Sequence, residues 1–173
     1  AKSSGKYSGD KVIPENIEYD GATYSVTSIG SEAFYDSDYL YSVVIPNSVT
    51  SIGNSAFESC LKLKSITIPN SVKRIEDEAF SSCSNLESTI IGNSVNSIGN
   101  RVFFRCPKLA SVTIGNSVTS IGYEAFCECS SLISVEIPNG VTGIGSHTFW
   151  GCHSLESITI GNSVTSIGQE AFY

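Results

Sequence analysis

The sequence is poor in several residue types that common functions require. It has 10 Lys and Arg against 17 Asp and Glu, a net charge of −7, and no basic run offsets this excess. Binding to nucleic acid or to anionic lipid is therefore not expected. No apolar stretch approaches the roughly 20 residues that span a bilayer, so we expect no membrane insertion in this segment. The first ten residues also lack the apolar core of a signal peptide.

Methionine is absent, and the chain contains one Trp and two His. The sequence begins with Ala and stops at Tyr173 in the middle of a repeat. These features are expected of a segment of a longer protein.

A period of 23 residues dominates what is present. Six leucines recur at this spacing without insertion or deletion: Leu40, Leu63, Leu86, Leu109, Leu132 and Leu155. Such strict spacing means that every copy follows the same backbone path, and periods of this length indicate a solenoid. A single copy is too short to bury its own apolar face, so neighbouring copies must stack on it.

Each copy divides into three segments. In the copy that begins at Leu63, LKSITIP alternates as a half-buried strand does and ends at a turn, where Pro or Gly is followed by Asn. The middle segment usually reads SVTSIG and predicts a bend. The last segment runs from a polar residue into Ala-Phe-x-x-Cys, which predicts a short capped helical turn. The positions that we expect to face inward are Leu63, Ile66, Ile68, Val72, Ile75, Ala79, Phe80 and Cys83.

These segments predict an α/β fold, built as a right-handed solenoid. Its concave side would carry a parallel sheet and its convex side the helical turns. Because helical turns need more room than strands, we expect the stack to bend into a horseshoe.

The two ends of the array are expected to differ. The pair Asp20-Gly21 predicts the turn of a small antiparallel hairpin, which would cap the N-terminal edge of the core. We assign residues 1–25 to a tail and this β cap, and residues 26–173 to the repeat array, as one continuous domain. No comparable cap follows Phe172, so the C-terminal edge is open to self-association.

Five of the six cysteines form one column at the repeat period: Cys60, Cys83, Cys106, Cys129 and Cys152. Stacked in this way they act as small hydrophobic residues, and their parallel side chains are poorly oriented for disulfides, although the spacing permits occasional oxidation. Cys127 lies outside the column. A zinc site that combines it with Cys129, His147 and His153 would require one ligand to leave the core. Neither a metal nor another cofactor is therefore predicted.

No residue stands out as a catalytic group. His147 and His153 occupy variable columns and are expected to be exposed. Serine forms an unbroken column in the strands, and no Asp–His pair is placed to activate one Ser over the others. A phosphate-binding Gly loop is also missing. We predict no catalytic residues and no enzymatic activity.

Ligand contacts should come from positions that the repeat leaves variable. On the concave side these are the residue after each Leu and the middle of each strand. The predicted ligand-binding residues are Tyr41, Lys64, Glu87, Glu136 and Glu156. An alternative set of aromatic contacts follows the repeated Phe on the convex side, namely Tyr35, Phe104 and Trp150. Aromatic residues are common at binding hot spots, but these could instead fold back as outer packing.

The pattern L-x-S-[VI]-x-I-[PG]-N-S-V-T-S-I-G-x-x-A-F-x-x-C resembles the BspA-like leucine-rich repeat family, which occurs in surface proteins of host-associated bacteria. The resemblance covers Val26 to Tyr173. It implies a leucine-rich-repeat solenoid and an extracellular or cell-surface location. The family is defined by its scaffold and not by a site, so the resemblance identifies no ligand.

Two functions remain open at this stage. The resemblance implies a non-catalytic module of a secreted or surface protein that binds a protein or a glycan, in adhesion or host interaction. The uniform Ser and Thr columns instead favour a structural spacer or assembly scaffold without a dedicated ligand.

Overall fold

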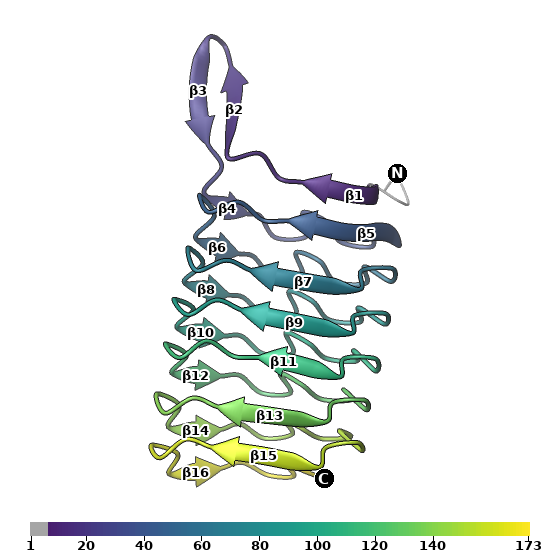
Figure 1. Ribbon diagram of the computed structural model, residues 1–173, viewed down its shortest axis with the longest axis vertical. Helices are drawn as coiled ribbons and strands as arrows, with labels where there is room; N and C mark the ends of the chain where they lie inside the picture. Colours follow the sequence, from purple (N-terminus) through teal and green to yellow (C-terminus); the bar gives the residue numbers. More distant parts are fainter. Residues whose placement is uncertain (1–6) are drawn as a thin grey trace.

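The computed structural model describes residues 7–173 as a β-solenoid without any helix (Figure 1). No described segment is therefore a helix long and apolar enough to cross a membrane. The strands are β1 (Ser8–Val12), β2 (Asn16–Tyr19), β3 (Ala22–Ser25), β4 (Ser28–Ile29), β5 (Tyr39–Val44), β6 (Ser51–Ile52), β7 (Ser65–Ile68), β8 (Arg74–Ile75), β9 (Ser88–Ile91), β10 (Ser97–Ile98), β11 (Ser111–Thr113), β12 (Ser120–Ile121), β13 (Ser134–Ile137), β14 (Gly143–Ile144), β15 (Ser157–Ile160) and β16 (Ser166–Ile167).

Each copy of the repeat makes one turn of the solenoid and contributes two strands. The longer strands form a five-stranded parallel sheet in the order β15-β13-β11-β9-β7, and we call its solvent side the strand face. The two-residue strands form a seven-stranded parallel sheet at the next corner, from β16 to β4. Paired residues are one repeat apart, as in Ser65 with Ser88, so the same column of the sequence stacks on itself.

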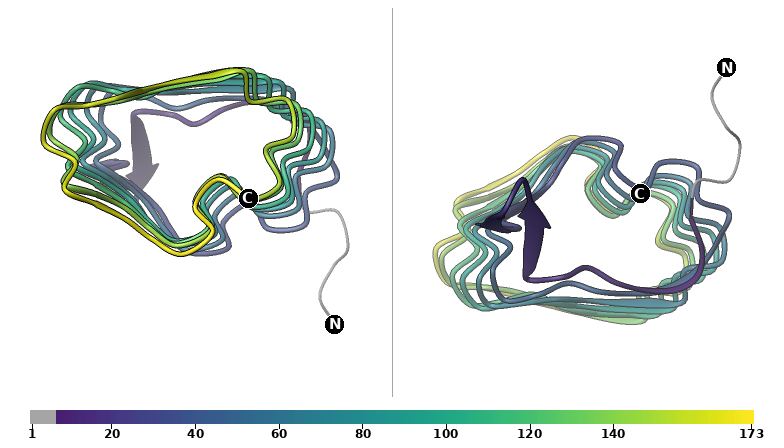
Figure 2. Two further views of the ribbon diagram at one scale, coloured as in Figure 1. Left: turned by 90° about the horizontal axis from the view of Figure 1, so that it is seen from below. Right: turned by 90° about the horizontal axis from the view of Figure 1, so that it is seen from above.

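The core lies inside the closed outline of the turns (Figure 2). All eight residues predicted to face inward in the copy from Leu63 are at most 2% exposed, which confirms the inward set. Phenylalanine forms a continuous stack from Phe34 to Phe172, in which neighbouring ring centroids lie 4.8 to 5.5 Å apart. Offset or parallel rings at such distances bury large apolar areas and add about 1 kcal/mol per pair.

The predicted helical turns, and with them the α/β class, are wrong. Ser55 and Ser59 have positive φ angles of 51° and 58°, which a right-handed helix does not allow. The N–H groups of Ser55, Phe57 and Ser59 donate to carbonyls of the next copy, whereas those of Ala56, Glu58 and Cys60 close tight turns within their own copy. The segment is thus a series of β-turns that forms its own ladder between copies. We call this side the turn face.

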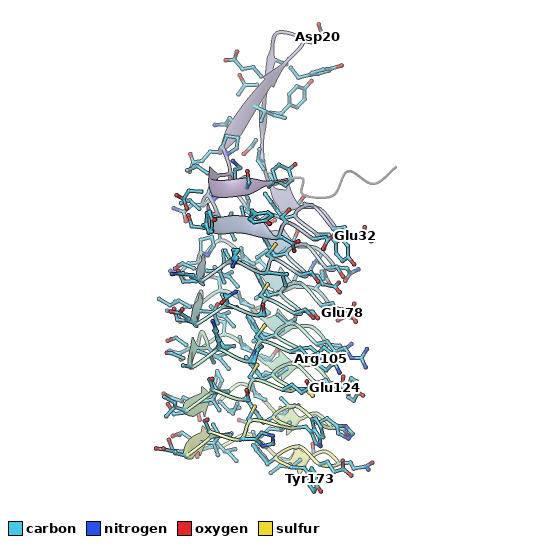
Figure 3. The ribbon with its side chains drawn as sticks, turned by 90° about the vertical axis from the view of Figure 1, so that its right-hand side faces the viewer. Asp20, Glu32, Glu78, Arg105, Glu124 and Tyr173 are labelled. Carbon is cyan, nitrogen blue, oxygen red and sulfur yellow. The ribbon has the colours of Figure 1, made fainter. Side chains whose placement is uncertain are left out.

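The predicted horseshoe also fails for the same reason. Turns that repeat at the strand spacing take no more room than the strands opposite them. The stack is accordingly nearly straight in two perpendicular views (Figures 1 and 3), so that the strand face is not hollowed by curvature.

The N-terminal hairpin forms as predicted but does not cap the core. β2 and β3 pair antiparallel around Asp20 and Gly21, which both have positive φ. Every residue of both strands is exposed, and the hairpin projects away from the stack (Figure 1). The first turn is instead covered by β1, which pairs in parallel with β5, and by Tyr7, whose ring centroid lies 4.7 Å from that of Phe34.

The Phe stack should dominate stability. We expect Phe80→Ala to lower the free energy of unfolding by about 3–5 kcal/mol, because it opens a cavity between two stacked neighbours. Phe172→Ala is the matched control, since Phe172 has a stacked partner on one side only and is 42% exposed. Urea denaturation followed by circular dichroism measures both, and equal losses for the two variants would contradict a stack stabilised from both sides.

Candidate binding surfaces

The five predicted ligand-binding residues are all exposed, four of them on the strand face and Tyr41 on β5, the neighbouring strand that pairs with β1. Tyr41 is in β5 and Glu136 in β13, while Lys64, Glu87 and Glu156 directly precede β7, β9 and β15. Alternation places Glu136 outward, because Val135 and Ile137 on either side of it face the core, whereas Lys64, Glu87 and Glu156 occupy the exposed position that follows each repeated Leu.

The structure does not bring the five together into one cluster. Lys64 and Glu87 are on neighbouring turns, where the Glu87 N–H donates to the Lys64 carbonyl at 2.8 Å. Glu136 and Glu156 are on neighbouring turns two turns further on, and the turn of β11 separates the two pairs. No ion pair joins any two of the five within residues 7–173. The strand face therefore offers a mixed patch towards β7 and an acidic patch towards β15.

A hollow of about 440 Å³ interrupts the strand face beside Glu136, between β11 and β13. Only one residue pair, Ser111 with Ser134, joins these two strands, whereas β13 and β15 share four pairs. The hollow is lined by Asn93, Ser111, Val112, Thr113, Ile114, Asn116, Ser134, Val135, Glu136 and Pro138. The main-chain groups of Glu136 that a longer β11–β13 ladder would use are thus available at this point.

The separation between these two turns continues around the next corner. At this corner of the other turns, the N–H of a Thr, Lys or Asn donates to the main-chain carbonyl of the equivalent residue one repeat earlier, at 2.8 to 2.9 Å. Within the described residues, the equivalent bond from Thr142 to Thr119 is missing. The bond expected from Gly145 to Ile121 is likewise missing there. On the turn face the copies close again, because the Phe126 N–H donates to the Thr148 carbonyl at 2.9 Å. We call this opening the β11/β13 seam.

Pro138 explains why the β11–β13 ladder stops after one residue pair. The column after each long strand holds Pro or Gly, and the glycines fit very closely: a Cβ on Gly115 would lie 2.3 Å from the Gly92 carbonyl oxygen, and one on Gly161 2.5 Å from that of Pro138. A proline brings a ring into this space and has no N–H to donate. Copies with Gly in this column therefore pair fully with the preceding strand, while the copy with Pro138 does not.

The other internal proline of this column has the same effect. Pro69 follows β7, and β7 has no ladder with β5 although the two strands are neighbours. The asparagine that follows shows the same break. Where a copy has Gly in this column, the main-chain N–H of its Asn donates to the side-chain oxygen of the Asn one copy earlier, as from Asn93 to Asn70. Within residues 7–173 this bond is missing at Pro69 and at Pro138.

Sequence reasoning missed the role of Pro138 because it treated Pro and Gly as equivalent turn residues. The alternation between them was visible in the sequence. The sequence could not show that two backbones approach closely at this column, so that Gly allows the ladder between neighbouring strands and Pro interrupts it.

The three aromatic residues of the turn face, Tyr35, Phe104 and Trp150, are all half-buried. Trp150 stacks on Tyr173 with ring centroids 6.5 Å apart. The guanidinium groups of Arg101 and Arg105 lie 5.4 and 4.9 Å from the Phe104 ring centroid. These residues therefore pack along the outer side while keeping part of each ring accessible.

Charged residues alternate along the same edge, where Glu32, Glu78, Arg105 and Glu124 are visible in Figure 3. Arg101 lies 2.6 Å from Glu124 and 3.7 Å from Glu78. Burial raises the pKa of the Glu124 carboxyl, but hydrogen bonds with Tyr123 and Arg101 outweigh it, so the pKa lies below its usual value. The Glu124 carboxylate consequently stays charged at neutral pH.

His147 differs from the prediction of an ordinary exposed residue. Its side chain is half-buried, with Nε2 lying 3.3 Å from a Glu170 carboxylate oxygen and the ring edge-on to Tyr123. Its Nδ1 is buried without a hydrogen-bond partner in the described chain. His153 is exposed.

Two hollows flank Trp150 on the turn face. One, of about 310 Å³, is lined by Arg101, Phe104, Glu124, Cys127, Glu128, His147, Trp150 and Glu170. The other, of about 390 Å³, is lined by Pro107, Glu128, Ser130, Trp150, Gly151 and His153. Glu128 and Trp150 line both.

All six cysteines are reduced and buried. Each thiol of the column donates to the carbonyl of the Phe one turn earlier, as from Cys83 to Phe57 at 3.1 Å. Ser37 replaces Cys in the first copy, where its hydroxyl is buried without a partner in residues 7–173. No group of three or more His, Cys, Asp or Glu side chains in the described chain could hold a metal ion.

The last turn exposes apolar groups that earlier turns cover. Ile160, Ile167 and Phe172 are exposed, and a hollow of about 370 Å³ lies against Phe149, Cys152 and other residues of this edge. In the interior of the stack the next copy occupies the equivalent space.

The family model of the BspA type leucine-rich repeat region matches six copies, over residues 15–133 and 103–173. No curated protein matches the chain in sequence. Similar solved structures come from bacterial leucine-rich repeat proteins. The crystal structure of the T. pallidum protein TpLRR is 35% identical, with a TM-score of 0.83 over 92% of this chain and 72% of that one.

Two further structures are similar. A leucine rich cell surface protein from Faecalibacterium prausnitzii A2-165 is 28% identical, with a TM-score of 0.51 over 94% of this chain and 66% of its own. The pneumococcal vaccine antigen PcpA is 25% identical, with a TM-score of 0.72 over 94% of this chain and 42% of its own. The chain thus spans less than two thirds of these two proteins.

The seam should close when its proline is removed. In Pro138→Gly we expect the β11–β13 ladder to extend, since the Glu136 and Asn139 N–H groups gain the acceptors that equivalent groups have elsewhere. Their amide hydrogen exchange, followed by NMR, should slow by at least about tenfold. Pro107→Gly, at an exposed proline outside the column, is the control; unchanged exchange at Asn139 in Pro138→Gly would refute the explanation.

The Cys127 thiol should react slowly. Burial, followed by the nearby Glu124 and Glu128 carboxylates, raises the pKa of this thiol to about 11. Because the thiolate is the reactive form, its fraction at pH 8 is about 0.001, against about 0.2 for a free cysteine. Iodoacetamide labelling, followed by intact mass, should be at least about 100-fold slower than in urea and should rise about tenfold per pH unit from pH 8 to 10. Cys127→Ser identifies the site, and fast labelling at pH 8 would contradict its burial.

Proposed function

The chain belongs to the BspA-type leucine-rich repeat family, and on that premise we propose that it is a non-catalytic module that binds a protein or a glycan on its strand face. The β11/β13 seam is the observation that carries the proposal. Between the other strands of the five-stranded sheet the ladder occupies the main-chain groups, but here hydroxyl, amide and main-chain groups surround a hollow beside the Glu136 carboxylate. Such a mixture of donors and acceptors suits hydroxyl or amide ligands.

We propose that the module acts outside the cell or on its surface, in adhesion or host interaction. The names of two similar structures support this location, since one is a cell surface protein and the other a vaccine antigen. We also propose that the segment assigned to residues 1–25, of which residues 1–6 lie outside the described part of the chain, forms one continuous domain with residues 26–173, because β1 joins the first turn by pairing with β5.

A spacer or assembly scaffold is the second candidate. The exposed Ile160, Ile167 and Phe172 of the last turn favour it, because a second copy that covered them would bury apolar surface. Sedimentation over a concentration series distinguishes such self-association from a monomeric binder.

The test is a binding screen of the purified chain against extracellular-matrix proteins, serum proteins and a glycan array. The variant changes all five predicted ligand-binding residues, Tyr41, Lys64, Glu87, Glu136 and Glu156, to Ala. We expect it to weaken binding of any hit at least about tenfold without lowering Tm, since all five side chains are exposed. The control is Glu58→Ala on the turn face.

Two results would overturn the proposal. Binding that survives the five substitutions would place the ligand elsewhere on the molecule. No hit from a well-folded protein would favour the spacer.

A further inference from the structure

The N-terminal hairpin has one apolar face and one polar face. Cross-strand partners in an antiparallel pair point to the same face, and successive residues of a strand alternate between the faces. The apolar face consists of Ile17, Tyr19, Ala22 and Tyr24. The polar face consists of Asn16, Glu18, Thr23 and Ser25.

Nothing in the described chain covers the apolar face. Ile17, Tyr19 and Tyr24 are 49, 72 and 52% exposed, and the hairpin projects away from the stack (Figure 1). A two-stranded hairpin is only marginally stable in water, whereas three strands with a hydrophobic face form a stable unit. The hairpin is therefore an incomplete sheet.

The outer edge of β2 offers main-chain groups to a third strand. The residue pair that flanks a two-residue turn is hydrogen-bonded, and such pairs alternate with open pairs along an antiparallel ladder. Counted from the turn at Asp20 and Gly21, the open pairs contain Glu18 and Asn16 of β2. Their N–H and C=O groups point to the side of β2 on which the sheet has no further strand.

The β2 edge is acidic, and the β3 edge is uncharged. Glu18 lies within β2, and Glu15 and Asp20 flank this strand; Asp20 marks the tip of the hairpin in Figure 3. All three are exposed, and none has an ion-pair partner within residues 7–173. β3 contains no charged residue.

The acidity extends into the first turns of the solenoid. Residues 12–61 contain seven Asp and Glu and no Lys, Arg or His. The rest of the chain has 10 Lys and Arg against 10 Asp and Glu, so the net charge of −7 resides in this segment. The resulting field attracts cationic partners to the hairpin end of the molecule.

This charge determines which strand the edge accepts. Pairing β2 with β2 of a second copy would bring the Glu18 carboxylates and their flanking acids together, and like charges across a pair are destabilising. A strand with Lys or Arg in the same place gains an attraction instead. The carboxylates thus select against self-pairing and for a basic strand.

We propose that the β2 edge binds an extended basic segment of another protein, in which Lys or Arg alternates with apolar residues. The segment adds a third strand, held by main-chain hydrogen bonds to Asn16 and Glu18. Its apolar side chains extend the face of Ile17, and its cations lie on the face of Glu18. The site is separate from the strand face, and it stands or falls independently of the function proposed there.

The probe is a fluorescein-labelled peptide, KVKVKVK, whose anisotropy is followed while the chain is added at about 0.05 M salt, where screening is weak. We expect saturable binding. Two comparison peptides, KKKVVVK with the same composition but no alternation and EVEVEVE with the opposite charge, should bind at least about tenfold more weakly.

The charge of the edge is tested with Glu18→Lys, which should retain its Tm and weaken binding at least about tenfold. Glu58→Lys is the matched control, because it makes the same change of charge on the turn face and should bind the peptide as the unmodified chain does.

The main-chain contact is tested without a change of charge. Asn16→Pro removes one N–H from the β2 edge, where the hairpin does not use it, and should weaken binding at least about threefold. Thr23→Pro removes the corresponding N–H from the β3 edge and should leave binding unchanged.

Three binding results would overturn the proposal: no saturable binding of KVKVKVK, equal affinities for KVKVKVK and KKKVVVK, or equal affinities of Glu18→Lys and Glu58→Lys. A dimer of the unmodified chain in sedimentation that Asn16→Pro dissociates would also overturn it, because a second copy would then occupy the edge.

Discussion

The distance between successive turns is the constraint on which this structure depends. Main-chain hydrogen bonds between copies hold neighbouring turns at the separation of two strands, all the way around the outline. Every side chain therefore lies directly against the same column of the next copy. Inward columns must repeat closely, since Phe must stack on Phe and each Cys thiol must reach the carbonyl one turn earlier. Outward columns are released from this requirement, and variation is confined to them.

Much of the fold follows from the sequence alone, because the period and the alternation are local patterns. The inward set from Leu63 to Cys83 and the hairpin at Asp20-Gly21 were predicted from such patterns, and the structure confirms both. The helical turns were not predictable in this way. Ala-Phe-x-x-Cys fits a helix locally, but Ser55 and Ser59 adopt left-handed conformations so that alternate N–H groups reach the next copy. That partner lies 22 to 23 residues away and has no signature within the segment.

The candidate sites also combine features that follow from local sequence patterns with features that depend on contacts between copies. The exposed positions of Tyr41, Lys64, Glu87, Glu136 and Glu156 were predictable from their places in the repeat. The hollow beside Glu136 was not, because it depends on how Pro138 sits against Gly115.

The seam also has a mechanical meaning. A pull along the axis of the stack loads its junctions in series, so each junction carries the same force whatever its strength. The junction at β5/β7 lacks its long-strand ladder but keeps the corner bonds from Lys73 and Glu76, whereas the one at β11/β13 has lost the corner bonds from Thr142 and Gly145 as well. Under tension the array would part first at one of these two junctions, into blocks that each stay folded. Pro69 and Pro138 thus mark the weak junctions of the rod.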